Sequence, residues 1–282
     1  MAANSSDAST GGQPVDASAF SPGACTAFGP TAGERSQTVF LDAGHGGIDP
    51  GGVGITEAGH TIREADETLR VELDAMALLR AEGFRVVVSR TRNSTVLRLG
   101  PGDLADGALT LQAAHDDVAA RDVCANLARA NVLVGIYFDA SSSPQNGGSL
   151  TAYDTDRPFS AANLRLAGLL QHAVLAAMNA QGWEIPNDGV LSDSGLGSSA
   201  GNPATGGLAA QSAAYDHLLL IGPAVAGYFS TPSEMPGAVI EPLYITDPFE
   251  GSIADSAHGQ LVIARGLATA IERFLGTPRP NP

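Results

Sequence analysis

The chain has 282 residues, of which 44% are hydrophobic and 16% charged, which is typical of a globular protein with one substantial core. Every basic residue is an arginine, and the 15 arginines are outnumbered by 30 acidic residues, so the formal net charge is −15. A surface of that sign repels phosphate backbones and anionic lipid headgroups, and nucleic acid is therefore excluded as an expected partner. No apolar stretch reaches the roughly 18–20 residues that a membrane-spanning helix needs, so we expect no transmembrane segment.

Residues 1–35 are rich in serine, alanine, glycine and proline. This composition is typical of a flexible tether, so the sequence predicts a leader over 1–35, one domain over 36–277 and a short tail over 278–282. A leader of this kind resembles what remains after removal of a signal or membrane segment, which makes export a hypothesis. Cys25 and Cys124 allow one disulfide in an oxidising compartment, and the alternative is a loop cysteine with a buried helix thiol.

Strand-like and helix-like segments alternate along the predicted domain. Taken in chain order, the apolar periodicity predicts strand Gln37–Ala43, helix Thr61–Glu82, strand Phe84–Ser89, helix Leu109–Arg129, strands Asn131–Phe138 and Gly148–Tyr153, helix Ser160–Gln181, strands His217–Gly222 and Gly237–Tyr244, and helix Ser256–Leu275. The alternation indicates an α/β fold with one mostly parallel, twisted sheet of about six strands flanked by helices. Asp188–Gln211 and Ala224–Met235 are predicted loops, for which a lid over a site and plain disorder both remain open.

Polar residues follow or end three of the predicted strands. His45 comes just after the first strand between glycines that let the backbone approach a ligand closely, and Asp139 and Glu241 lie at the ends of two later strands. The carboxyl ends of parallel strands meet at one edge of a sheet, where ligands bind. An unpaired carboxylate such as Glu241 is costly to bury and needs a cation or a catalytic role. Glu64 lies in the first turn of the next helix, either as a surface acid favoured by the helix dipole or as a ligand.

Five segments occur in the same order as in a known family. They are Phe40–Gly47 (FLDAGHGG), Arg63–Asp66 (READ), Phe84–Arg92 (FRVVVSRTR), Arg121 with Ala125–Asn126, and Gly237–Asp247. With these segments the chain resembles the zinc-dependent N-acetylmuramoyl-L-alanine amidases of the type-3 family, which cut stem peptides from peptidoglycan. The resemblance implies a site with three parts: His45 and Glu64 as zinc ligands, Glu241 as the general base and Arg121 as support. It also implies peptidoglycan or muropeptides as the partner, and an extracellular, periplasmic or cell-wall location.

One position departs from the family pattern, because Tyr137 stands where the family has the histidine that is its third zinc ligand. The residues that could replace this ligand are Tyr137 itself through its phenolate, the neighbouring Asp139, His60 four residues before Glu64, and His115. Each also has a structural interpretation, since Tyr137 can simply fill the vacated space. The remaining histidines, His172, His217 and His258, are expected to be solvated or structural.

Two hypotheses for the function follow. In the first, the chain is an active amidase that uses Zn²⁺, or Mn²⁺ or Fe²⁺ if the site tolerates more oxygen ligands. In the second, it is a catalytically silent domain that binds or regulates peptidoglycan because the histidine ligand is missing. Tyr137 is the residue on which the choice between them depends.

Overall fold

The computed structural model describes residues 11–194, 196 and 214–276, and these residues build one mixed, mostly parallel sheet. Its strands run in the order β1-β2-β6-β3-β9-β12-β10-β11. Their bounds are β1 Gln13–Pro14, β2 Ala24–Phe28, β3 Thr38–Ala43, β6 Arg85–Arg90, β9 Val132–Ile136, β10 Ser149–Tyr153, β11 Asn187–Ser192 and β12 Gly237–Glu241. The four central strands, β6, β3, β9 and β12, are parallel to one another, whereas β2 and β10 join them in the antiparallel direction. The predicted α/β fold is confirmed, with eight strands in the sheet instead of about six.

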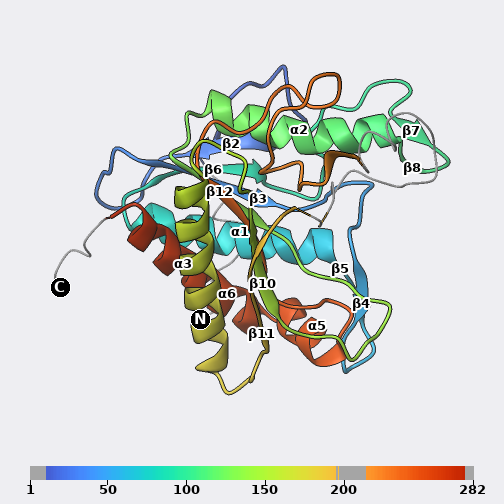
Figure 1. Ribbon diagram of the computed structural model, residues 1–282, viewed down its shortest axis with the longest axis vertical. Coiled ribbons are helices and arrows are strands. Elements are labelled where there is room, and N and C mark those ends of the chain that lie inside the picture. The colour runs from blue at the N-terminus through green and yellow to red at the C-terminus, as the bar shows by residue number, and fades with distance from the viewer. Residues whose placement is uncertain (1–10, 195, 197–213, 277–282) are drawn as a thin grey trace.

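Helices cover both faces of the sheet (Figure 1). Helix α2 (Leu111–Leu127) lies on one face, and α1 (Glu64–Ala81), α3 (Ser160–Asn179) and α6 (Ala257–Phe274) lie on the other. The short helix α5 (Pro248–Asp255) precedes α6. Two small hairpins, β4–β5 (Val53–Ile55 and Thr61–Arg63) and β7–β8 (Leu104–Ala105 and Ala108–Leu109), project from this three-layer body.

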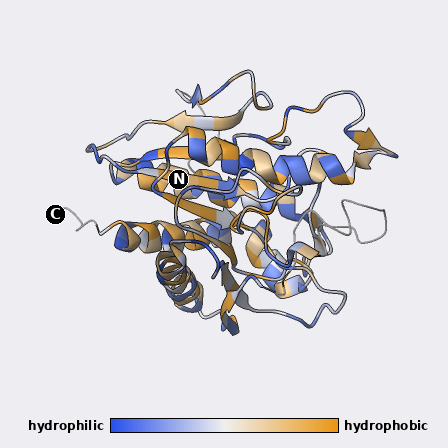
Figure 2. Cartoon of the chain, turned by 45° about the horizontal axis from the view of Figure 1, so that its top comes forward, coloured by the Kyte–Doolittle hydropathy of each residue, from blue (hydrophilic) through white to orange (hydrophobic). Residues whose placement is uncertain are grey.

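The middle residues of the central strands are apolar because both faces of these strands are buried. On β3, Val39 and Leu41 pack in the cluster beneath α1, α3 and α6, whereas Phe40 packs in the cluster beneath α2. This alternation is the two-residue period of a strand. Figure 2 shows the result, with hydrophobic strands at the centre and hydrophilic residues on the outer sides of the helices. The two cores hold the carboxyl ends of the central strands at fixed positions.

Three predictions about the elements are wrong. Residues Thr61–Arg63 form strand β5, so the helix predicted from Thr61 begins only at Glu64. The segment 217–222 forms a turn closed by hydrogen bonds from the backbone N–H groups of Ile221 and Gly222 to the carbonyl oxygen of Leu218. Its apolar residues are buried beneath α2 from that turn, so their hydrophobicity reflects packing and not a strand. Within the predicted loop 188–211, residues 188–192 belong to β11, whose polar and partly exposed residues lack the apolar pattern of a strand. The part of that loop from 197 onward lies outside the described residues.

The predicted leader is also wrong in part, since Ala24–Phe28 form β2 and pair with β6. Cys25 and Phe28 are buried, and Cys25 forms a disulfide with Cys124 of α2. Five residues are too short a run for the composition of the whole segment to reveal. Residues 1–10 and 277–282 lie outside the described residues, and they include the start of the predicted leader and all of the predicted tail. Among the helices that are described, none has the length and apolarity needed to cross a membrane.

Candidate active site

The carboxyl ends of β3, β9 and β12 meet at one edge of the sheet, as expected for neighbouring parallel strands. Gly135 of β9 pairs with Asp42 of β3 on one side and with Val239 of β12 on the other, so the three strands end at the same level. The loop after β3 carries His45, and Glu241 is the last residue of β12. The fold therefore brings the predicted histidine and the predicted general base to the same edge.

The loop that carries His45 is held in a strained conformation. His45 itself has a φ of 61°, a left-handed value that is uncommon outside glycine and typical of functional sites. The Arg121 guanidinium donates a hydrogen bond of 2.8 Å to the carbonyl oxygen of His45 and so fixes this turn. Gly51 passes so close that an added Cβ would lie 2.6 Å from the imidazole ring and 2.7 Å from Glu64 Oε2. Only glycine lets the chain pass over the pair at this point.

His45 and Glu64 face each other, with 3.2 Å between Nε2 and Oε2. His45 Nδ1 donates to Asp49 Oδ2 at 2.7 Å, which fixes the ring and aims Nε2 at the carboxylate. Glu64 is 3% exposed, and its two oxygens accept hydrogen bonds from the backbone N–H groups of Phe138 and Gly52 at 3.0 and 2.8 Å. Burial lowers the pKa of His45, but the charge of Glu64 and the hydrogen bonds of both carboxylates outweigh burial and raise it to about 10. The carboxylates of Glu64 and Asp49 therefore favour a positive charge at His45.

Glu241 is half-buried at the end of β12 and forms a side-chain hydrogen bond with Asp139. Burial, followed by the negative charges of Asp139 and Glu64, raises the pKa of Glu241 to about 8, although His45 acts in the opposite direction. Asp139 also forms a hydrogen bond with the Tyr244 side chain. Glu241 thus lies beside two other carboxylates and is poised to exchange a proton near neutral pH.

Tyr137 is the residue predicted to replace the third ligand, but its hydroxyl points away from the histidine and carboxylate pair. The hydroxyl donates to Asp42 Oδ2 at 3.3 Å, and the ring lies 5.5 Å from the imidazole of His45, centroid to centroid. Burial, and then the charge of Asp42, raise the pKa of Tyr137 well above its ordinary value. Asp42 in turn accepts a hydrogen bond of 2.6 Å from Arg121, so the predicted support residue connects the tyrosine to the His45 turn.

The other two predicted replacements lie elsewhere. His60 is exposed in the turn of the β4–β5 hairpin, where its backbone N–H donates to Thr56 Oγ1. His115 is buried on α2, where its ring packs against Tyr228 and Phe229 at 4.8 and 6.2 Å. Of the candidates for a third ligand, only Tyr137 and Asp139 therefore contact the residues of the candidate site.

Two residues of the site were not predicted. Asp49 orients the imidazole of His45, and the only sequence signal for it is its position four residues after the histidine. Arg90, at the end of β6, is buried and donates to the carbonyl oxygens of Ala43, Gly44 and Ala65, which ties the His45 loop to the start of α1. Its place inside the Phe84–Arg92 segment was a signal for the fold but not for this role.

His45 and Glu64 suit two positions of a divalent metal site. Asp49 holds the imidazole through Nδ1, the support that metal-bound histidines ordinarily have, and leaves Nε2 to face the carboxylate. A third protein ligand is not in place, because within the described residues no third histidine, cysteine or acidic side chain brings a ligand atom within 4.8 Å of both. The donor set thus fits a metal in two of the three protein positions that a catalytic zinc site uses.

The site thus combines a histidine with carboxylates at the carboxyl edge of a mixed α/β sheet. Comparison with known families identifies the family, because residues 39–273 match the model of the N-acetylmuramoyl-L-alanine amidases called Amidase_3. The chain belongs to this family. A comparison with curated protein sequences gave no match.

Solved structures of such amidases share the fold. CwlD from Clostridioides difficile, solved in complex with the GerS lipoprotein, has a TM-score of 0.62 at 20% identity over 86% of this chain and 99% of its own. The catalytic domain of CwlV from Bacillus (Paenibacillus) polymyxa has a TM-score of 0.56 at 19% identity, with the same shares covered. Ami1 from Mycobacterium smegmatis has a TM-score of 0.54 at 17% identity over 87% of this chain and 99% of its own.

Proposed function

We propose that the chain hydrolyses the amide between N-acetylmuramic acid and the L-alanine of the stem peptide, in peptidoglycan or in muropeptides. The observation that carries this proposal is the pairing of His45 Nε2 with Glu64 Oε2 at 3.2 Å, at the same sheet edge as Glu241. The membership in the amidase family supports the substrate class. This substrate lies outside the cytoplasmic membrane, and the disulfide between Cys25 and Cys124 is consistent with an oxidising extracellular, periplasmic or cell-wall location.

His45 and Glu64 would hold a divalent cation, with Zn²⁺ as the first choice and Mn²⁺ or Fe²⁺ as alternatives for a site rich in oxygen ligands. Such an ion supplies polarisation of the scissile carbonyl and a lowered pKa for its bound water. Asp49 keeps the imidazole of His45 oriented, and the backbone N–H groups of Phe138 and Gly52 hold the two oxygens of Glu64. These contacts fix the ligand atoms before any ion binds, which reduces the cost of binding.

Glu241 acts as the general base in this proposal. Its carboxylate takes a proton from the attacking water as the oxygen bonds to the carbonyl carbon, and it then gives that proton to the alanine nitrogen as the amide bond breaks. With a pKa near 8, this carboxyl group is poised to hold a proton and release it at neutral pH. Burial, and then the negative charge of the neighbouring Asp139, raises this pKa.

A silent peptidoglycan-binding or regulatory domain is the second candidate function. The observation that favours it is the Tyr137 hydroxyl, which contacts Asp42 and not the pair formed by His45 and Glu64. Two protein ligands hold a metal more weakly than three, so such a domain would bind peptidoglycan without a working ion.

The experiment that separates these functions measures release of stem peptides with a new N-terminal alanine from purified peptidoglycan, by mass spectrometry. Active chain releases them, a chelator stops the release, and Glu241→Gln lowers the rate by at least about 100-fold because the general base is lost. Glu184→Gln, at an exposed position after α3, is the matched control and keeps full activity. Release no faster than from Glu241→Gln, from a folded chain supplied with Zn²⁺, Mn²⁺ or Fe²⁺, would establish the silent domain instead.

A further inference from the structure

A second cluster of ligand atoms lies away from the candidate active site. Asp154, Asp193 and His217 each offer one ligand atom, and the three atoms lie within 4.8 Å of one another. Both aspartates are 0% exposed, and the imidazole is 12% exposed. Leu150 lies opposite Glu241 in the antiparallel pairing of β10 and β12. Asp154 follows Leu150 by four residues, just beyond the end of β10, so it lies on the order of 13 Å from Glu241. The cluster therefore lies toward the other edge of the sheet.

The pairing of two parallel strands brings the aspartates together. Tyr153 of β10 pairs with Ser192 of β11, so the residues that follow, Asp154 and Asp193, leave the sheet side by side. The Leu218 backbone N–H donates to Asp193 Oδ2 at 3.1 Å, and this contact brings the preceding histidine onto the two carboxylates. Three segments that are distant in the sequence are thus joined at this cluster.

One carboxylate oxygen of the cluster is left without a hydrogen bond. Asp154 Oδ1 accepts hydrogen bonds from the backbone N–H groups of Asp156 and Arg157, but Oδ2 has no hydrogen-bond donor among the described residues. This fully buried oxygen lies 2.9 Å from His217 Nδ1, an ion-pair distance but outside hydrogen-bond geometry, whereas Asp193 Oδ1 forms a long hydrogen bond of 3.5 Å with the same nitrogen. Two ligands bound about 2.0 Å from a tetrahedral zinc ion lie about 3.3 Å apart. The two observed distances bracket that value.

The charge of the cluster also calls for a cation. Two carboxylates that are both 0% exposed and lie side by side repel each other. Buried charges of this kind are stable only with a proton, a counter-ion or a metal. An imidazole with two carboxylates favours a first-row divalent transition metal over Mg²⁺ or Ca²⁺, which prefer oxygen ligands alone.

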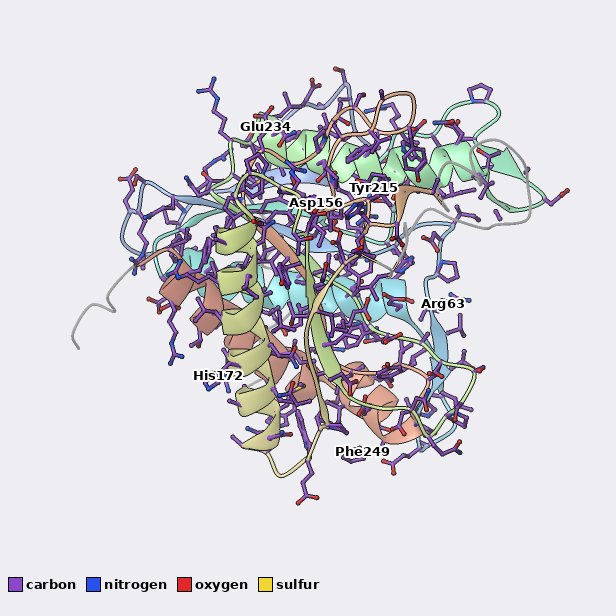
Figure 3. The ribbon with its side chains drawn as sticks, in the orientation of Figure 1. Arg63, Asp156, His172, Tyr215, Glu234 and Phe249 are labelled. Atoms are coloured by element: carbon purple, nitrogen blue, oxygen red, sulfur yellow. A yellow bond between two sulfur atoms is a disulfide. The ribbon has the colours of Figure 1, made fainter. Side chains whose placement is uncertain are left out.

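We propose that Asp154, Asp193 and His217 form a second metal site that takes a divalent transition metal ion, zinc by preference, in a structural role. The ion joins the ends of β10 and β11 to the segment that leads into β12. Figure 3 labels two neighbours of His217, namely Asp156, whose Oδ2 lies 3.8 Å from Nε2, and Tyr215, whose ring packs 5.3 Å from the imidazole on the α2 side of the sheet. This site does not depend on the proposed hydrolysis.

The test uses untagged full-length chain carrying Glu64→Gln, so that the candidate catalytic site cannot account for bound metal. After exposure to Zn²⁺ and removal of excess, elemental analysis should find about one zinc ion per chain. Zinc at a free concentration about 100-fold above the Kd should raise the Tm by roughly 5–10 °C. Adding Asp193→Asn, a change that keeps the size of the side chain, should abolish both effects, and His217→Gln provides an independent second variant.

The matched control adds Asp156→Asn to the same background, at a side chain that is 64% exposed and is not a proposed ligand, and it should keep the zinc and the Tm shift. Circular dichroism establishes that each variant is folded. The proposal is overturned if Glu64→Gln chain holds no zinc, if Asp193→Asn and His217→Gln leave the zinc in place, or if Ca²⁺ or Mg²⁺ binds where Zn²⁺ does not.

Discussion

Replacing Tyr137 by histidine should restore the third protein ligand of the candidate active site. The Tyr137 ring lies 5.5 Å from the imidazole of His45, centroid to centroid. Two imidazoles bound to one tetrahedral zinc ion at about 2.0 Å have centroids about 5 Å apart, so a histidine ring at this position is within reach of an ion held by His45 and Glu64. The free energy of zinc binding to a structural site with about four ligands is roughly 10–16 kcal/mol, so each ligand contributes on the order of 3 kcal/mol. We therefore expect Tyr137→His to tighten zinc binding about 100-fold.

The assay is competition for Zn²⁺ against a chromophoric chelator, in chain that also carries His217→Gln so that only the candidate active site contributes. Tyr137→Phe is the matched control, because it keeps the ring and removes the hydroxyl that donates to Asp42. Its zinc affinity should equal that of the parent. A folded Tyr137→His chain with unchanged affinity would refute the geometric argument, and a tenfold loss in Tyr137→Phe would show that the phenol oxygen is itself a ligand.

Three further predictions concern stability. Replacing Cys25 and Cys124 by alanine opens a disulfide that spans 99 residues and should lower the free energy of unfolding in denaturant by about 2–5 kcal/mol, whereas a loss below about 1 kcal/mol would contradict this. Chiefly through burial, the pKa of Glu72 is raised from 4.5 to about 8 and that of Glu67 to about 7. The folded chain therefore binds more protons than the unfolded chain between about pH 5 and 8, so the Tm should fall as pH rises over this range. A Tm that rises with pH over this range would contradict the prediction. Arg121→Gln leaves two buried carboxylates without their cation, so denaturant unfolding should show a loss of about 3–5 kcal/mol, and a loss below about 1 kcal/mol would mean that these ion pairs are not needed.

The main features of the fold were predictable because they depend on local apolar patterns. Strand β3 and helix α1 follow directly from the periodicity of Gln37–Ala43 and Thr61–Glu82. Strand β2 was hidden, since it has only five residues and lies within a segment whose overall composition is that of a tether. Its burial comes from pairing with β6 and from the link to α2, and both are tertiary contacts that no local pattern records.

The candidate site was predictable to the extent that its residues follow strands. His45 and Glu241 lie at the strand ends where the α/β rule places them, and the structure brings them to one edge. Asp49 was missed because its role depends on a left-handed turn at His45 that folds the loop back on itself. The cluster that includes His217 was missed for a different reason. Its members come from three segments with no common spacing, so only the sheet register reveals it.

The contacts of Tyr137 give it a structural place beside the predicted metal ligand His45. The ring packs against His45, the hydroxyl donates to Asp42, and the Asp42 carboxylate is paired with Arg121, which also holds the His45 carbonyl oxygen. The tyrosine is therefore part of the network that positions the remaining ligand. The same network disfavours the phenolate, because ionised Tyr137 would place a second negative charge beside Asp42, and burial adds to the cost. A metal bound at this edge would be held by His45 and Glu64 with a further oxygen ligand, and Asp139, which lies beside Glu241, is the predicted replacement that offers a carboxylate.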